Sequence, residues 1–261
     1  MNIGFFDSGI GGLSVLREAL MLMPNENYIY FADSDNAPYG TKTKEEVKKL
    51  TFNAVGFLNE RGIKALVIAC NTATSAAVRD LREAYDFPVI GMEPAVKPAV
   101  EKNNNRGKRV LVMATALTLK EEKFQNLIAR FDAEHIVDML PAPKLVEFAE
   151  KFMFYGPEVS DYIKEIMPDN IDQYGTLVLG CTHFPLFRQA LEENLPKEID
   201  IIDGNRGTVN HLMDILKNNN LLSRSDKKGK VTFYKSGVEV KDQTLLKKYE
   251  KILYSRELKN P

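Results

Sequence analysis

The fold class is decided by the stretch Ala65-Leu66-Val67-Ile68-Ala69-Cys70-Asn71-Thr72-Ala73-Thr74, an aliphatic run that ends on a cysteine and continues into small polar residues. A short aliphatic run bounded by polar residues is typical of a buried strand in a parallel sheet. Ligands of open α/β sheets bind just beyond the carboxyl ends of such strands. We therefore expect Cys70 to lie at a strand end and to face a cleft.

A second stretch, Thr176-Leu177-Val178-Leu179-Gly180-Cys181-Thr182-His183, repeats this pattern around the only other cysteine. Taken alone, a cysteine is most often a small buried core residue. A thiol at a strand end indicates a nucleophile instead. Two thiols in matching contexts indicate a third alternative, a pair of acid/base groups that face one substrate from opposite sides.

The composition argues against several classes of protein. The chain has 35 basic and 36 acidic residues, so it carries no electrostatic signature of nucleic-acid or membrane binding. No apolar run approaches the ~20 residues of a membrane span, and the first residues lack the features of a signal peptide. We expect a cytoplasmic protein with free thiols.

The order of strands and helices predicts two α/β lobes. A strand–turn–helix pattern repeats up to about residue 91 and restarts after about residue 97. Such repeats are typical of mainly parallel sheets flanked by helices. We assign 1–96 with 205–261 to a first, Cys70-bearing lobe and 97–204 to a second, Cys181-bearing lobe that is pseudo-symmetric with it. Expected helices include 13–23, 44–61, 74–85, 119–131 and 243–254.

Small polar residues follow four of the expected strands. Hydroxyls, amides and free N–H groups at helix N-termini bind carboxylates well, although any one such residue can be a simple helix cap. Four sites together favour a small anionic ligand. The four are Asp7-Ser8, Cys70-Asn71-Thr72, Thr115 with Thr118, and Cys181-Thr182-His183. A helix N-terminus or a nearby cation would lower a thiol pKa towards neutrality, and Asp7 and His183 are the natural partners of the two thiols.

The glycine-rich turn Gly9-Ile10-Gly11-Gly12-Leu13-Ser14 half-matches the dinucleotide fingerprint, and Asp33 stands near the ribose-binding position. Ser14 replaces the third glycine, so we disfavour a dinucleotide. The two cysteines are far apart in the chain and form no CxxC pair, so they match no common zinc spacing. We expect neither a cofactor nor a metal.

Five motifs together resemble glutamate racemase, a cofactor-independent enzyme of the aspartate/glutamate racemase superfamily. They occur in the family's order over roughly residues 2–205, and some neighbouring segments depart from it, among them Ala142-Pro143-Lys144-Leu145-Val146. The motifs are Phe6-Asp7-Ser8-Gly9-Ile10-Gly11-Gly12-Leu13, Pro38-Tyr39-Gly40, Ala69-Cys70-Asn71-Thr72-Ala73, Glu93-Pro94 with Lys97-Pro98, and Gly180-Cys181-Thr182-His183-Phe184-Pro185.

The resemblance implies an active site between the two lobes. The residue that matches Cys70 removes the α-proton of D-glutamate with the help of Asp7, and the one that matches Cys181 acts on L-glutamate with the help of His183. The remaining matches imply substrate contacts. They are Ser8, Tyr39, Gly40, Asn71, Thr72, Thr115, Thr118, Thr182 and, in a looser alignment, Glu150.

The expected function is therefore interconversion of L- and D-glutamate, which supplies D-glutamate for peptidoglycan. The expected partner is glutamate, and the family commonly forms homodimers. Three alternatives stay open at this point: an aspartate racemase or one that accepts both acidic amino acids, a non-catalytic amino-acid-binding protein, and a dinucleotide-dependent oxidoreductase.

Overall fold

The first sheet is organised around a strand whose side chains are buried along nearly all of its length, β1 (Asn2–Asp7). In the computed structural model, which describes residues 1–104 and 106–255, β1 pairs in parallel with its neighbours on both sides. The sheet has the order β10-β9-β2-β1-β3-β4, with β10 as the antiparallel edge strand. The other strands are β2 (Tyr28–Ala32), β3 (Ile63–Ile68), β4 (Val89–Gly91), β9 (Val231–Lys235) and β10 (Val238–Glu239).

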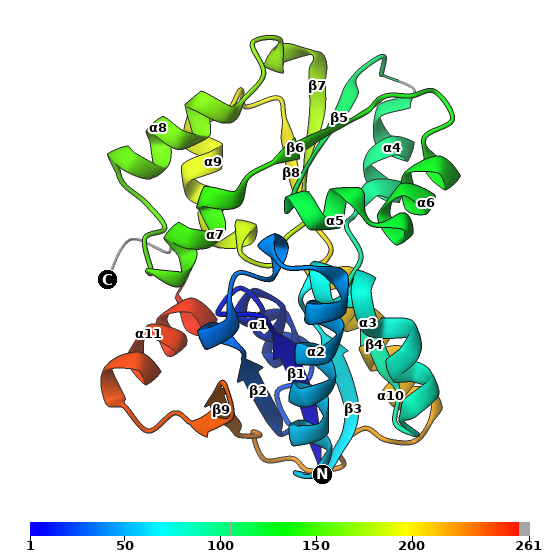
Figure 1. The fold of residues 1–261 in the computed structure, drawn as a ribbon, viewed down its shortest axis with the longest axis vertical. Coiled ribbons are helices and arrows are strands. Elements are labelled where there is room, and N and C mark those ends of the chain that lie inside the picture. The colour runs from blue at the N-terminus through cyan, green and yellow to red at the C-terminus, as the bar shows by residue number, and fades with distance from the viewer. Residues whose placement is uncertain (105, 256–261) are drawn as a thin grey trace.

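The second sheet repeats this design with four parallel strands in the order β6-β5-β7-β8. Its central strands are apolar and buried, whereas β6 is partly exposed. Figure 1 shows the two sheets in separate lobes, one above the other. The strands are β5 (Arg109–Ala114), β6 (Val137–Pro141), β7 (Tyr174–Leu179) and β8 (Asp200–Asp203).

Helices flank both sheets (Figure 1). None of the helices in the described part of the chain has the length and apolar content needed to cross a bilayer. The first lobe carries α1 (Leu13–Leu22), α2 (Lys44–Asn59), α3 (Asn71–Ala84), α10 (Asn205–Asn218) and α11 (Gln243–Tyr254). The second carries α4 (Val96–Asn104), α5 (Ala116–Lys120), α6 (Glu122–Phe131), α7 (Pro143–Glu150), α8 (Pro157–Ile166) and α9 (Arg188–Asn194). Four short 3₁₀ turns are η1 (Ser34–Asn36), η2 (Tyr39–Thr41), η3 (Ile171–Gln173) and η4 (Phe184–Phe187).

The expected α/β class is confirmed, and the largest differences from the expected helices are at the start of α3 and within 119–131. The helix after Cys70 begins at Asn71 rather than Thr74, because the Cys70 thiol caps it by accepting a hydrogen bond from Ala73 N at 3.4 Å. The helix expected over 119–131 is two helices, because Glu121 adopts extended backbone angles between them.

The C-terminal segment returns to the first sheet, where β9 pairs in parallel with β2. Sequence alone does not reveal this pairing, because the whole second lobe, residues 97–204, and helix α10 lie between β4 and β9 in the chain. The strand orders support the lobe boundaries expected from sequence, and we propose 1–96 with 205–261 and 97–204 as the two units.

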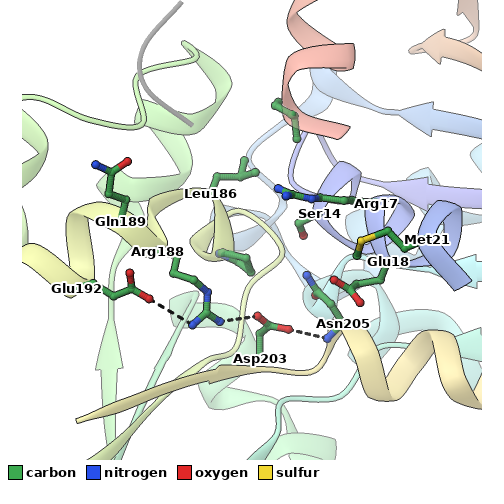
Figure 2. Close-up of a pocket in the computed structure, with 12 residues that line it drawn as sticks. Ser14, Arg17, Glu18, Met21, Leu186, Arg188, Gln189, Glu192, Asp203 and Asn205 are labelled. Carbon is green, nitrogen blue, oxygen red and sulfur yellow. Dashed lines mark hydrogen bonds and ion pairs between the residues drawn. The ribbon is translucent and has the colours of Figure 1, made fainter. Parts of the chain in front are cut away.

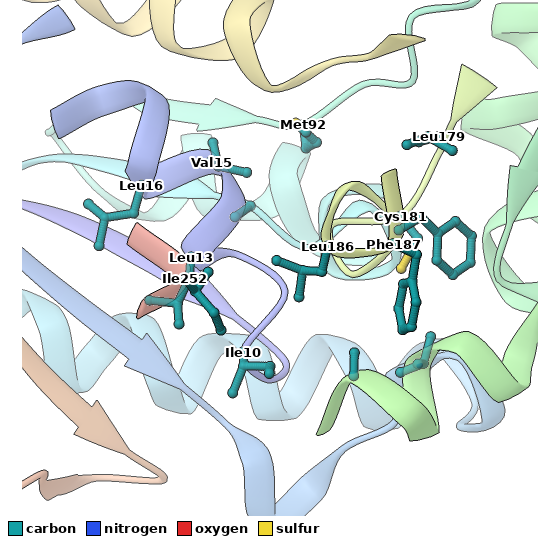
Figure 3. Close-up of a cluster of buried hydrophobic side chains, with 14 of the residues drawn as sticks. Ile10, Leu13, Val15, Leu16, Met92, Leu179, Cys181, Leu186, Phe187 and Ile252 are labelled. Carbon is teal, nitrogen blue, oxygen red and sulfur yellow. The ribbon is translucent and has the colours of Figure 1, made fainter. Parts of the chain in front are cut away.

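One apolar core runs through both lobes. Ile10 and Leu13 of the first lobe belong to the same buried cluster as Leu186 and Phe187 of the second, and Ile252 of α11 completes it (Figure 3). These side chains are at most 4% exposed. Because the lobes share this core, the strand ends that meet at their junction hold fixed positions relative to one another.

A buried ion pair secures the other end of the first sheet. Lys64 Nζ lies 2.6 Å from Glu26 Oε2, and both side chains are less than 10% exposed. Lys64 Nζ also donates to Leu221 O, and Glu26 Oε1 accepts from Ser223 N. The pair therefore ties β3 to the segment that follows α10.

Lys64→Met should lower the free energy of unfolding by about 3–5 kcal/mol, because it removes the cationic partner of the buried Glu26 side chain. Urea denaturation at neutral pH measures this. Lys48→Met is the matched control, since Lys48 pairs with Asp80 at the surface with both side chains 43% exposed and should lose less than about 1 kcal/mol. Equal losses in the two variants would contradict the prediction.

Candidate active site

Both thiols line one small cavity of about 80 Å³ at the junction of the lobes. The carboxyl ends of β1, β3, β5 and β7 lead into it, as expected for ligand sites of open α/β sheets. Ten of the site residues expected from sequence line it: Ser8, Tyr39, Gly40, Cys70, Asn71, Thr72, Thr115, Cys181, Thr182 and His183. The other three, Asp7, Thr118 and Glu150, lie outside the lining and form hydrogen bonds with residues that belong to it.

Cys70 is 5% exposed and sits at the N-terminus of α3. Its Sγ lies 3.6 Å from Ser8 Oγ and 3.4 Å from Ala73 N. Burial, reinforced by the negative charge of Asp7, raises the pKa of this thiol to about 12. The expectation that the helix N-terminus lowers a thiol pKa towards neutrality is therefore wrong for Cys70, because desolvation outweighs the helix N-terminus.

Cys181 lies at the start of a hydrogen-bonded chain. Its Sγ is 3.6 Å from His183 Nδ1, and His183 Nε2 is 2.8 Å from Glu150 Oε1. Burial alone lowers the pKa of His183, but its contacts with Cys181 and Glu150 raise it well above the usual value. An imidazolium beside a thiol stabilises negative charge on sulfur. The two thiols thus occupy electrostatically different surroundings.

Asp7 is fully buried between these two surroundings. Its carboxylate accepts hydrogen bonds from Gly9 N and from the Thr182 hydroxyl, both at 3.1 Å. Among the described residues, no hydrogen bond joins it to Cys70, so its influence on that thiol acts through its charge. Burial raises the pKa of Asp7 to about 6, against the opposing effect of positively charged His183.

The glycine-rich turn after β1 brings backbone against the second lobe. A Cβ atom on Gly9 would lie 1.9 Å from Glu150 Oε1, and one on Gly11 would lie 2.6 Å from His183 Nδ1. Ile10 N donates to Glu150 Oε1 at 2.8 Å. These contacts explain the glycines that half-match a dinucleotide fingerprint, since Glu150 and His183 occupy the space in front of them.

Asn71, Thr72 and Thr115 place polar side-chain atoms along the cavity, and Thr118 lies behind them. Both the Nδ2 and Oδ1 atoms of Asn71 are buried without a hydrogen-bond partner among the described residues. The hydroxyls of Thr72, Thr115 and Thr118 form a closed group with Oγ1–Oγ1 distances of 2.9–3.1 Å. Because buried polar atoms are normally satisfied, Asn71 indicates the position of a polar ligand.

Sequence reasoning missed several residues of the site. The signal that could have found the α7 residues is helical spacing, because Val146 and Glu147 share a face with Glu150. Sequence also gave no sign of the contact that Ser14 makes, since its Oγ donates to Thr182 O at 3.0 Å and so supports the residue next to Cys181. The missed lining residues are Pro38, Thr41, Ala116, Pro143, Val146 and Glu147.

A larger cavity of about 480 Å³ lies elsewhere at the lobe junction, between α1, α9 and the start of α10 (Figure 2). Within it, Arg188 Nη2 donates a hydrogen bond to Asp203 Oδ2 at 3.0 Å, and Asp203 Oδ1 accepts a hydrogen bond from Asn205 N. It is lined by none of the site residues expected from sequence. The described residues contain no group of three His, Cys, Asp or Glu side chains placed to hold a metal ion.

Comparison with known proteins agrees with this arrangement. Residues 13–212 match the family model of Asp/Glu/Hydantoin racemases. The chain is 56% identical to glutamate racemase of Halothermothrix orenii, over 97% of this chain and 99% of that protein. The crystal structure of glutamate racemase from Francisella tularensis in complex with D-glutamate superposes with a TM-score of 0.81 at 29% identity, covering 98% of this chain and 94% of that one.

A third relative is Escherichia coli glutamate racemase, whose structure contains L-glutamate and the activator UDP-MurNAc-Ala. It has a TM-score of 0.78 and 31% identity, covering 95% of each chain. This protein therefore belongs to the Asp/Glu/Hydantoin racemase family and is an amino-acid racemase.

The raised pKa of Asp7 predicts a distinctive pH dependence for Asp7→Asn. A carboxyl whose folded pKa is raised contributes stability below its unfolded pKa, and that contribution is lost as pH rises through the folded value near 6. Asparagine does not titrate, so the variant does not lose stability in this pH range. The variant should therefore gain about 2 kcal/mol of unfolding free energy relative to the parent between pH 4.5 and pH 8. Paired urea titrations measure the difference, and a gap that does not grow with pH would refute it.

The raised pKa of Cys70 predicts its reactivity. In Cys181→Ser, the only remaining thiol is Cys70, and its alkylation by iodoacetamide should accelerate about tenfold per pH unit from pH 7 to pH 10, because the thiolate fraction rises in that proportion below the pKa. A model cysteine peptide should level off above its pKa of about 8.5. Mass spectrometry follows both rates. Levelling of the Cys70 rate near pH 8.5 would contradict a pKa of about 12.

Proposed function

We propose that this protein is a cofactor-independent glutamate racemase, and that Cys70 and Cys181 exchange the α-proton of glutamate on opposite faces. The observation that carries the proposal is the cavity into which β3 of one lobe and β7 of the other each deliver one thiol. Inversion at Cα requires loss of a proton from one face and gain of a proton on the other. Two single-proton groups on opposite sides perform this without rotation of the substrate.

The relatives support glutamate as the substrate. A relative at 56% identity is named glutamate racemase, and the solved structures of two other glutamate racemases, at 29% and 31% identity, contain D-glutamate and L-glutamate. We infer that the same dicarboxylate occupies the cavity between the two thiols here.

The unpartnered amide of Asn71 suits the backbone part of an amino acid. Its Oδ1 can accept from the α-ammonium, and its Nδ2 can donate to a carboxylate. The free N–H groups at the start of α3 and the hydroxyls of Thr72 and Thr115 supply further donors for the negative charges. We assign Ser8, Tyr39, Gly40, Thr118 and Thr182 to the same substrate-binding group.

In the L-to-D direction, the Cys181 thiolate takes the α-proton and the Cys70 thiol delivers its own proton to the opposite face. The surroundings suit these roles, since burial keeps Cys70 protonated at neutral pH and His183 Nδ1 lies 3.6 Å from the Cys181 sulfur. After turnover the thiolate is on Cys70. The α-ammonium of the substrate then supplies a nearby positive charge that offsets its burial and the charge of Asp7.

Glu150 and Asp7 act in this scheme through their neighbours. Glu150 accepts a hydrogen bond from Nε2 of His183 and so holds the ring with its other nitrogen, Nδ1, towards Cys181. Asp7 holds the Thr182 hydroxyl and, by its charge, favours the protonated form of Cys70. Carbanion character at Cα is stabilised by hydrogen-bond donors aimed at the α-carboxylate within a closed cavity. The resulting D-glutamate would supply peptidoglycan synthesis, as the resemblance of the motifs implies.

Single replacement of either thiol tests the proposal. Cys70→Ser and Cys181→Ser should each lower racemisation by about 10²- to 10⁴-fold, the contribution of one positioned acid or base. In D₂O, Cys181→Ser should still exchange the α-proton of D-glutamate, and Cys70→Ser that of L-glutamate, because each retains one base. Polarimetry and proton NMR measure both effects.

The parent enzyme in D₂O is the reference and should place deuterium at Cα of the product. Substantial racemisation by either variant would refute the two-thiol scheme, and faster turnover of L-aspartate than of L-glutamate by the parent would refute the assignment of substrate.

A further inference from the structure

The turn between β9 and β10 reaches the loop that forms one wall of the active-site cavity. That loop, residues 33–41, follows β2 and contributes Pro38, Tyr39, Gly40 and Thr41 to the lining. Ser236 in the turn donates from its backbone N to Ala32 O at 2.8 Å. The C-terminal part of the chain therefore contacts the loop where the loop begins.

The Ser236 hydroxyl makes two bonds within this loop. It donates to Asp33 Oδ1 at 3.1 Å and accepts from Asp35 N at 3.0 Å. Asp33 is 5% exposed, and its other oxygen accepts from the Tyr39 hydroxyl at 2.6 Å. A continuous chain of short hydrogen bonds thus runs from Ser236 through Asp33 to Tyr39.

This chain ends against the second lobe. Gly40 follows Tyr39 directly, and a Cβ atom on Gly40 would lie 2.8 Å from Thr115 Cβ. Thr115 belongs to the group of three hydroxyls in the cavity. A small displacement of the loop would therefore change the distance between the cavity walls at the point where the lobes meet.

Ser236 has a positive φ, a backbone conformation that is unfavourable for serine. Ser236 and Gly237 form a two-residue turn with φ values of +43° and +89°. Such turns favour asparagine or glycine at the first position, because a side chain there is strained. Serine is a poor choice for the turn itself, whereas its hydroxyl adds a donor from the C-terminal hairpin to the buried carboxylate of Asp33, which also accepts from Asn36 and Tyr39 within the loop.

We propose that Ser236 is a positioning residue for the substrate cavity, which acts through Asp33 to hold Tyr39 and Gly40 against Thr115. The inference rests on the proposed function, because it assigns this wall to substrate binding. Ser236 lies outside the cavity lining and touches neither thiol.

Three variants distinguish the effect of losing the Ser236 hydroxyl from the effect of changing the backbone of the turn. Ser236→Gly removes the hydroxyl and relieves the backbone, Ser236→Ala removes it without that relief, and Ser236→Asn suits the backbone and restores a donor. Val238→Ala is the control, because Val238 lies in the same hairpin and is 72% exposed.

The glycine and alanine variants should raise KM for D-glutamate about five- to tenfold, the effect of losing one typical hydrogen bond, with kcat within about twofold of the parent. Amide hydrogen exchange in 33–41, at Asp35 above all, should accelerate. Ser236→Asn and Val238→Ala should match the parent in both measurements. A merely structural role predicts a lower melting temperature for Ser236→Ala with unchanged KM.

Parent-like KM and parent-like exchange in Ser236→Gly would overturn the inference, as would an equal change in Val238→Ala. The exchange measurement needs no turnover. If the parent enzyme does not racemise glutamate, the proposed function fails, while exchange in 33–41 and calorimetric binding of D-glutamate still decide whether Ser236 positions this wall.

Discussion

The hydrogen bond from the Thr182 hydroxyl to the buried carboxylate of Asp7 joins the ends of two strands that belong to different lobes. The rest of the site depends on this junction, since Cys181 and His183 flank Thr182 and the glycine-rich turn follows Asp7. A second bridge, from Ile10 N to Glu150, runs beside it. Both are embedded in an apolar core shared by the lobes, which excludes water and keeps the two thiols in one cavity.

Burial at this junction has an electrostatic consequence. Asp7 and Cys70 both have raised pKa values because desolvation disfavours their charged forms, whereas His183 keeps its proton through Cys181 and Glu150. The site therefore contains a Cys70 thiol that burial keeps protonated and a Cys181 thiol whose sulfur lies 3.6 Å from His183 Nδ1. The raised pKa of Asp7 means that its burial costs stability once the carboxyl ionises.

The walls of the cavity come from segments that are distant in the chain. Tyr39 and Gly40 follow β2, Thr115 caps α5, and the turn at Ser236 supports the first of these from the C-terminal hairpin. The first lobe thus needs residues from both ends of the chain. A sequence pattern of strands and helices describes each segment but not which segments touch.

The sequence by itself determined the α/β class, the two lobes, the family resemblance and the placement of both cysteines at strand ends, because short buried strands and the residues at their ends leave local patterns. It was also sufficient to nominate ten residues that line the cavity. Only the tertiary structure decided the protonation of Cys70, the return of β9 to the first sheet, and the contacts of Ser14, Val146 and Ser236 with the site. Those features depend on desolvation and on contacts between residues far apart in sequence, and neither leaves a trace in local periodicity.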